Sequence, residues 1–220
     1  MNEKIKTENT LVFSYLTLRK TIGILGTAFP FLLYFGALII FGTGIQDSIS
    51  SYYYTNMGDV FVGILCVIGF FLFSYKGYER KDDFAGDLAC IFAVGIALFP
   101  TMHDGVTTDT ERVVAIVHFA FATLFFTTLI YFSLYLFTKS DPNEAPTPEK
   151  LRRNKVYKIC GYAMIVSIAL IIVYFILPDS IKLPLKSRNP VFWLESIAVI
   201  AFGISWLTKG EAISILEDKV

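Results

Sequence analysis

Six apolar stretches alternate with polar segments along the chain. They cover approximately residues 21–41, 58–76, 84–100, 113–137, 156–177 and 190–208. A helix needs about twenty mostly apolar residues to cross the hydrocarbon core of a bilayer, because its backbone must satisfy its own hydrogen bonds there. The pattern therefore predicts an all-α polytopic transmembrane helix bundle of six spans. The second and third stretches are the shortest, and they reach span length only by including Asp59 and Asp87.

The basic residues predict a direction for this bundle. With six spans, fifteen of the nineteen Lys and Arg residues fall on one side of the membrane, and the other side holds only Arg112, Lys182, Lys186 and Arg188. Connections rich in Lys and Arg stay in the cytoplasm. We therefore expect both termini to be cytoplasmic.

The longest inner connection, residues 138–155, contains Pro142, Pro146 and Pro148. Proline disfavours continuation of a helix, so we expect a linker here between two halves of three spans each. No convincing internal repeat relates the halves, and the whole chain, 1–220, is expected to form a single transmembrane domain.

The composition narrows the classes of function. The chain is 55% hydrophobic and 16% aromatic, with 19 basic and 19 acidic residues, which is outside the ordinary range of soluble domains. A balanced charge does not favour nucleic acid as a partner. The expected partners are membrane lipids, and a homo-oligomer is a further candidate.

A histidine and two carboxylates are predicted at one depth on the outer side. His118 lies about 9 Å inward from Arg112, Glu195 lies about 7 Å inward from Pro190, and Asp59 opens the second span. Ionisable groups inside spans are costly and therefore mark candidate sites. We expect His118 to act as a base, with Asp59 and Glu195 as acidic or orienting partners. Singly, each also has a structural interpretation, as a first-turn acid or as a hydrogen-bonding histidine.

The first outer loop carries further candidates for substrate binding. It contains Ser51 and three consecutive tyrosines, Tyr52, Tyr53 and Tyr54, and the next outer loop contains His103. Tyrosines at a membrane boundary are typical of the aromatic belt. Alternatively, their hydroxyl groups line a vestibule that leads to the site.

A divalent metal is a minor alternative at this site. Its ligands would be His118, His103 and Asp59, because imidazole and carboxylate groups bind such ions. Only two histidines are present, and neither an H-x-x-x-H nor an H-E-x-x-H spacing occurs.

Several motifs resemble a family of bacterial six-helix inner-membrane proteins that has no assigned activity. They are residues 48–63 (SISSYYYTNMGDVFVG), 97–101 (ALFPT), 118–120 (HFA), 193–195 (WLE) and 205–211 (SWLTKGE). This resemblance implies a bacterial inner membrane. A fainter outline is similar to the ceramidase-like membrane hydrolases, which place Ser, Asp and His on several helices around a zinc ion. Those proteins have seven helices and a histidine pair near the C-terminus, which this chain lacks.

Three functions follow as hypotheses. The first is the binding or processing of a lipid or envelope molecule at the outer polar site. The second is a transporter or channel for a small solute or protons, in which the same groups titrate. The third is a sensing or assembly protein without turnover.

Overall fold

The computed structural model describes residues 2–77, 80–103, 105, 108–140, 145–213 and 216. The described chain is all-α. Its elements are α1 (Asn2–Phe41), the 3₁₀ helix η1 (Ser50–Tyr54), α2 (Gly58–Phe73), α3 (Arg80–Leu98), α4 (Asp109–Tyr131), the π-helical turn η2 (Phe132–Leu136), α5 (Pro148–Ile176), α6 (Asp179–Lys186) and α7 (Pro190–Lys209).

Four segments of this bundle are long and apolar enough to cross a membrane: Tyr15–Phe41, Asp109–Leu136, Pro148–Ile176 and Pro190–Lys209. The apolar helix α2 has 16 residues, and at 1.5 Å per residue it extends only about 24 Å. The first two turns of α3 hold Asp82, Asp83 and Asp87 besides two basic residues. The described residues thus form a helical bundle, and four of its helical segments have the length and composition of a membrane span.

The helix boundaries differ from the predicted ones where polar residues continue a helix. The helix that contains residues 21–41 begins at Asn2. The helix expected at 156–177 begins at Pro148, inside the range 138–155 that the sequence predicts as a linker; residues 141–144 of that range lie outside the described residues. Proline is well suited to the first position of a helix, where its missing N–H group has no partner to lose. The Thr147 hydroxyl caps the same end by accepting the Lys150 N–H at 3.1 Å.

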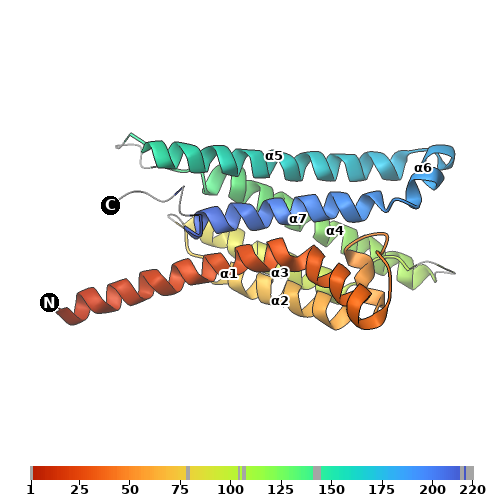
Figure 1. The fold of residues 1–220 in the computed structure, drawn as a ribbon, viewed down its shortest axis with the longest axis horizontal. Helices are drawn as coiled ribbons and strands as arrows, with labels where there is room; N and C mark the ends of the chain where they lie inside the picture. The colour runs from red at the N-terminus through yellow and green to blue at the C-terminus, as the bar shows by residue number, and fades with distance from the viewer. Residues whose placement is uncertain are drawn as a thin grey trace.

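Successive long helices run in opposite directions, so the connections gather at two ends (Figure 1). The connections after α1, α3 and α5, which include η1 and α6, lie at one end, called the η1 end here. The start of α1 and the connection after α7 lie at the other, called the terminal end. Helix α7 packs mainly against α1 and α5, whereas α3 packs against α2 and α4.

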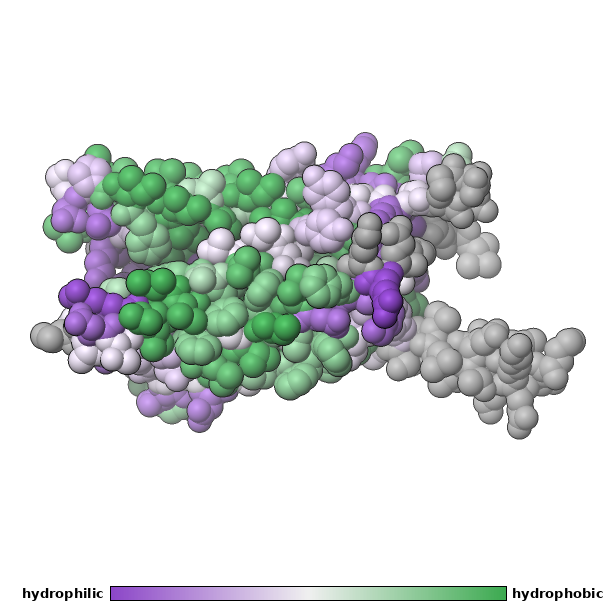
Figure 2. Space-filling view, turned by 180° about the vertical axis from the view of Figure 1, so that it is seen from behind, coloured by the Kyte–Doolittle hydropathy of each residue, from purple (hydrophilic) through white to green (hydrophobic). Residues whose placement is uncertain are grey.

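The surface between the two ends is apolar. Figure 2 shows mainly hydrophobic side chains across the middle of one face and hydrophilic ones concentrated toward its ends. Large apolar side chains such as Phe31 (50% exposed) and Val166 (55% exposed) point outward. A continuous exposed apolar surface of this kind suits contact with lipid.

Helices α1 and α7 approach each other through glycines. A Cβ atom on Gly203 would lie 2.5 Å from the Thr27 backbone nitrogen and 2.8 Å from the Gly23 carbonyl oxygen. Small residues allow two helix backbones to approach this closely in a membrane.

Buried aromatic rings fill the interior near the terminal end. Trp206 is fully buried, and its ring centroid lies 5.1 to 5.5 Å from those of Tyr75, Phe132 and Phe137. Beside them, the hydroxyl groups of Ser133 and Ser205 form a buried hydrogen bond of 2.9 Å.

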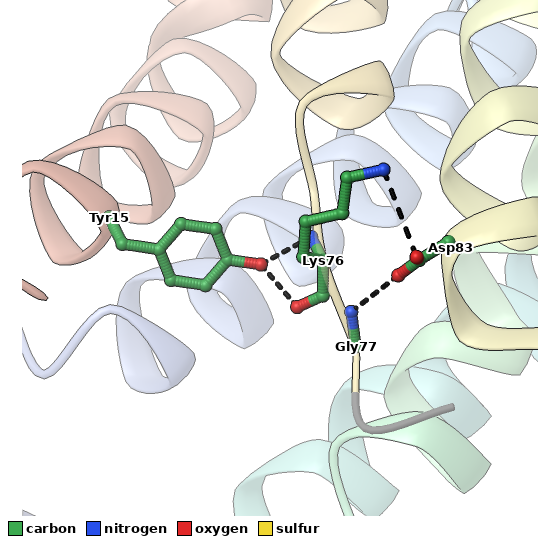
Figure 3. A network of polar contacts seen from close by, with 4 residues as sticks. All are labelled: Tyr15, Lys76, Gly77 and Asp83. Carbon is green, nitrogen blue, oxygen red and sulfur yellow. Dashed lines mark hydrogen bonds and ion pairs between the residues drawn. The ribbon is translucent and has the colours of Figure 1, made fainter. Parts of the chain in front are cut away.

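Polar contacts tie the connection between α2 and α3 to α1 at the terminal end (Figure 3). The Tyr15 hydroxyl contacts the backbone N–H and C=O groups of Lys76. The Gly77 N–H donates to Asp83 at 2.9 Å, and the Lys76 ammonium lies 3.8 Å from the same carboxylate.

Candidate functional site

His118 lies in α4, is 1% exposed and is hydrogen-bonded through both ring nitrogens. Its Nδ1 atom lies 2.7 Å from the Phe99 carbonyl oxygen, and its Nε2 atom lies 3.0 Å from the Ser50 hydroxyl oxygen. A carbonyl oxygen only accepts hydrogen bonds, so Nδ1 must carry the proton. In the neutral ring Nε2 is then the acceptor, and Ser50 donates its hydroxyl hydrogen to it.

Ser50 is the first residue of η1, and this element places its hydroxyl over α4. A hydroxyl bonded to an imidazole that a third group orients is the usual arrangement of an activated nucleophile. Here the third group is the Phe99 carbonyl just after α3. Ser50 was not among the predicted site residues, whereas its neighbour Ser51 was.

Glu195, in α7, holds the start of η1 from the other side. Its Oε2 atom accepts the Ile49 N–H at 2.6 Å, directly before Ser50 in the chain. Backbone N–H groups at the start of a helix lack partners within the helix and favour negative charge. His118 and Glu195 therefore both hold the start of η1, His118 through the Ser50 side chain and Glu195 through the Ile49 backbone.

Asp59 does not join these two residues. It lies exposed in the first turn of α2, where it lines a hollow of about 640 Å³ together with Phe41, Tyr53 and other residues. Neither His118 nor Glu195 is among the residues that line this hollow. The predicted convergence of three ionisable groups is thus reduced to two.

The three tyrosines of η1 have different surroundings. Tyr52 is fully buried, with its ring 6.1 Å from that of Phe192, and burial raises the pKa of its hydroxyl above the ordinary value. Tyr54 donates its hydroxyl hydrogen to the Thr101 carbonyl at 2.7 Å. Only Tyr53 lines the hollow beside Asp59.

Ser51 and His103 have partners other than His118. The Ser51 N–H donates to the Ser48 hydroxyl at 3.0 Å, and the two hydroxyl oxygens are 2.7 Å apart. The His103 ring packs on Tyr54, with centroids 4.5 Å apart. Both residues therefore support the shape of the loop around η1.

The described residues do not assemble the predicted metal ligands. Within them, no three His, Cys, Asp or Glu side chains lie close enough together to hold a metal ion. Both nitrogens of His118 already have partners, and His103 and Asp59 have other surroundings. The donor set of His118, His103 and Asp59 does not fit a zinc centre as the structure places it.

The site's own residues suit proton transfer at a hydroxyl group. Ser50 carries the proton, the unprotonated Nε2 of His118 is the acceptor, and the Phe99 carbonyl would stabilise the charged ring. No family model, curated protein or solved structure matches this chain.

Proposed function

We propose that the chain crosses the bacterial inner membrane six times, with both termini in the cytoplasm and the η1 end outside. The alternating directions of the helices support this topology (Figure 1), as does the excess of Lys and Arg on the side of the terminal end. Helices α2 and α3 would be the two short spans, which pack on each other and lie beside α1 and α4. The assignment to a bacterial inner membrane is based on the resemblance of residues 48–63 and the other motifs.

At the η1 end, the proposed function is acyl transfer or hydrolysis on a lipid or envelope molecule. Ser50 is the proposed nucleophile and His118 the general base. The observation that carries this proposal is the chain of hydrogen bonds from Ser50 Oγ to His118 Nε2 and from His118 Nδ1 to the Phe99 carbonyl. It contains the nucleophile, the base and the group that orients the base.

The proposed reaction needs only an ester and water. Ser50 Oγ attacks the carbonyl carbon of the ester while its proton moves to His118 Nε2, and the departing alcohol takes that proton as its C–O bond breaks. Water then attacks the acyl-serine and gives a proton to His118. The bond from the acyl group to Oγ breaks, and the proton returns to Ser50.

Glu195 has a positioning role in this scheme. Its carboxylate accepts the Ile49 N–H at 2.6 Å and so fixes the backbone from which Ser50 projects. It takes no proton in the proposed steps.

The experiment is covalent labelling of the purified full chain in lipid nanodiscs with a fluorophosphonate, followed by mass spectrometry of the peptide that contains Ser50. We expect labelling of the wild type at Ser50, none at this position in Ser50→Ala, and full labelling in Ser51→Ala. In His118→Gln the labelling rate should fall by about a hundredfold or more, because the base is lost. Melting temperatures of all variants show whether each remains folded.

Labelling that is absent from the folded wild type, or equally fast in folded His118→Gln, contradicts the proposal. The second candidate function is then favoured, a binding or sensing protein without turnover. One observation supports it: the two hydrogen bonds of His118 also fasten η1 to α3 and α4. The transporter hypothesis has less support, since buried rings such as Phe125, Phe132 and Trp206 occupy the interior among the described helices.

A further inference from the structure

A hollow of about 640 Å³ opens at the η1 end, between the end of α1 and the start of α2. Phe41 and Tyr53 supply apolar and aromatic surface, and Asn56 and Asp59 supply an amide and a carboxylate. Its size falls within the usual range of small-molecule sites. Neither Ser50 nor His118 is among its lining residues, so the hollow is distinct from the hydrogen-bonded site.

Three polar groups that line this hollow have no polar partner within the described fold. The Asp59 carboxylate, the Asn56 amide and the Tyr53 hydroxyl make no hydrogen bond or ion pair with another described residue. Thr55, by contrast, donates to the Tyr52 carbonyl and accepts the Met57 N–H. The first three groups are thus available to a ligand.

The chemistry of the lining selects a cation. Among the described lining residues Asp59 is the one charged group, and none is basic. A carboxylate attracts a cation, and the faces of Tyr53 and Phe41 are the kind of surface on which an ammonium group is stabilised. Asp59 itself lies in the first turn of α2, where the helix end stabilises its negative charge. An anionic ligand such as a free phosphate would be repelled by the same carboxylate.

We propose that this hollow binds an organic ammonium group. If the proposed function also holds, the substrate is an amine-bearing amphiphile. Its ammonium group occupies the hollow while its ester reaches Ser50. Tyr53 follows Ser50 by three residues in η1, which corresponds to a rise of about 6 Å in a 3₁₀ helix. The two sites are therefore within the reach of one small headgroup.

The test is calorimetric titration of the full chain in nanodiscs of phosphatidylglycerol with choline and with 3,3-dimethylbutanol, its uncharged carbon analogue. Choline is expected to bind the wild type, and the uncharged analogue to bind at least about tenfold more weakly. Asp59→Asn should weaken choline binding by a similar factor. Asp109→Asn is the matched control, because Asp109 also lies exposed in the first turn of a helix at the η1 end, and it should leave binding unchanged.

Equal binding of choline and its uncharged analogue, or unaltered choline binding in folded Asp59→Asn, overturns the inference. The Ser50→Ala variant distinguishes a failure of this inference from a failure of the proposed function. Choline binding to both the wild type and Ser50→Ala without serine labelling contradicts the proposed reaction but supports the hollow. Serine labelling without choline binding contradicts the hollow alone.

A second titration distinguishes the source of the ammonium group. In nanodiscs that contain phosphatidylethanolamine, a lower apparent affinity for choline supports a lipid headgroup as the natural occupant. An unchanged affinity supports a free amine.

Discussion

Replacing Gly203 by alanine should separate α1 from α7 and destabilise the bundle. The added Cβ would lie 2.5 Å from the Thr27 nitrogen and 2.8 Å from the Gly23 oxygen, whereas ordinary contacts begin near 3.4 Å. Both neighbouring atoms belong to the backbone of α1, so no rotamer change can make room. One helix must therefore move by several tenths of an ångström along the contact.

The magnitude follows from two opposing effects. Overpacking a well-packed contact costs about 1–3 kcal/mol, while Gly→Ala inside a helix contributes about 1 kcal/mol of propensity in favour of the variant. The matched control is Gly63→Ala in α2, because a Cβ there has no neighbour within 4 Å. The propensity gain is the same in both variants, so we expect Gly203→Ala to be less stable than Gly63→Ala by the overpacking cost of about 1–3 kcal/mol.

The assay is thermal unfolding of both variants in the same detergent, followed by the loss of the monodisperse peak in size-exclusion chromatography. For a chain of this size, 2 kcal/mol corresponds to about 4–8 °C in melting temperature. A Gly203→Ala protein that melts at or above the temperature of Gly63→Ala would refute the close approach of α1 and α7.

Three further predictions concern polar groups. Asp82→Asn removes the 2.6 Å ion pair with Lys139 from a carboxylate that is 1% exposed. In chemical unfolding, the free energy of unfolding should fall by about 1–3 kcal/mol, since Lys139 stays partly in solvent. Glu195→Ala leaves the Ile49 N–H without its partner, so hydrogen exchange at η1 should accelerate, while exchange in the middle of α5 stays unchanged. Burial raises the pKa of Tyr52 above 10.0, so the unfolded chain ionises first and stability falls as the pH rises above that value. Tyr52→Phe should therefore lose less stability than the wild type between about pH 9 and pH 11, as measured by melting temperature.

Much of the helical framework could be predicted from apolar periodicity alone. Each of the six apolar stretches coincides with a helix of the bundle. The start of α5 could not be predicted, because its polar first turns form a helix without an apolar signature. Pro148 illustrates the ambiguity: a proline that ends one helix has the same appearance in the sequence as one that begins the next.

The candidate site was predictable only in part. His118 and Glu195 could be selected because ionisable groups within apolar helices are costly. Depth along a helix does not determine rotation about its axis, however, and Asp59 lies exposed on α2 although its depth is similar. Ser50 could not be selected, because serines are common in loops and its contact with His118 spans 68 positions of sequence.

The central position of α7 has a consequence for biogenesis. Helices α1 and α5 both find their main packing partner in α7, which follows α1–α6 in the chain and is synthesised after them. Until it emerges from the ribosome and enters the bilayer, the contact surfaces of α1 and α5 face lipid or a chaperone. The glycine contact between α1 and α7 and the hydrogen bond from Ile49 to Glu195 can therefore form only after most of the chain has been translated and inserted.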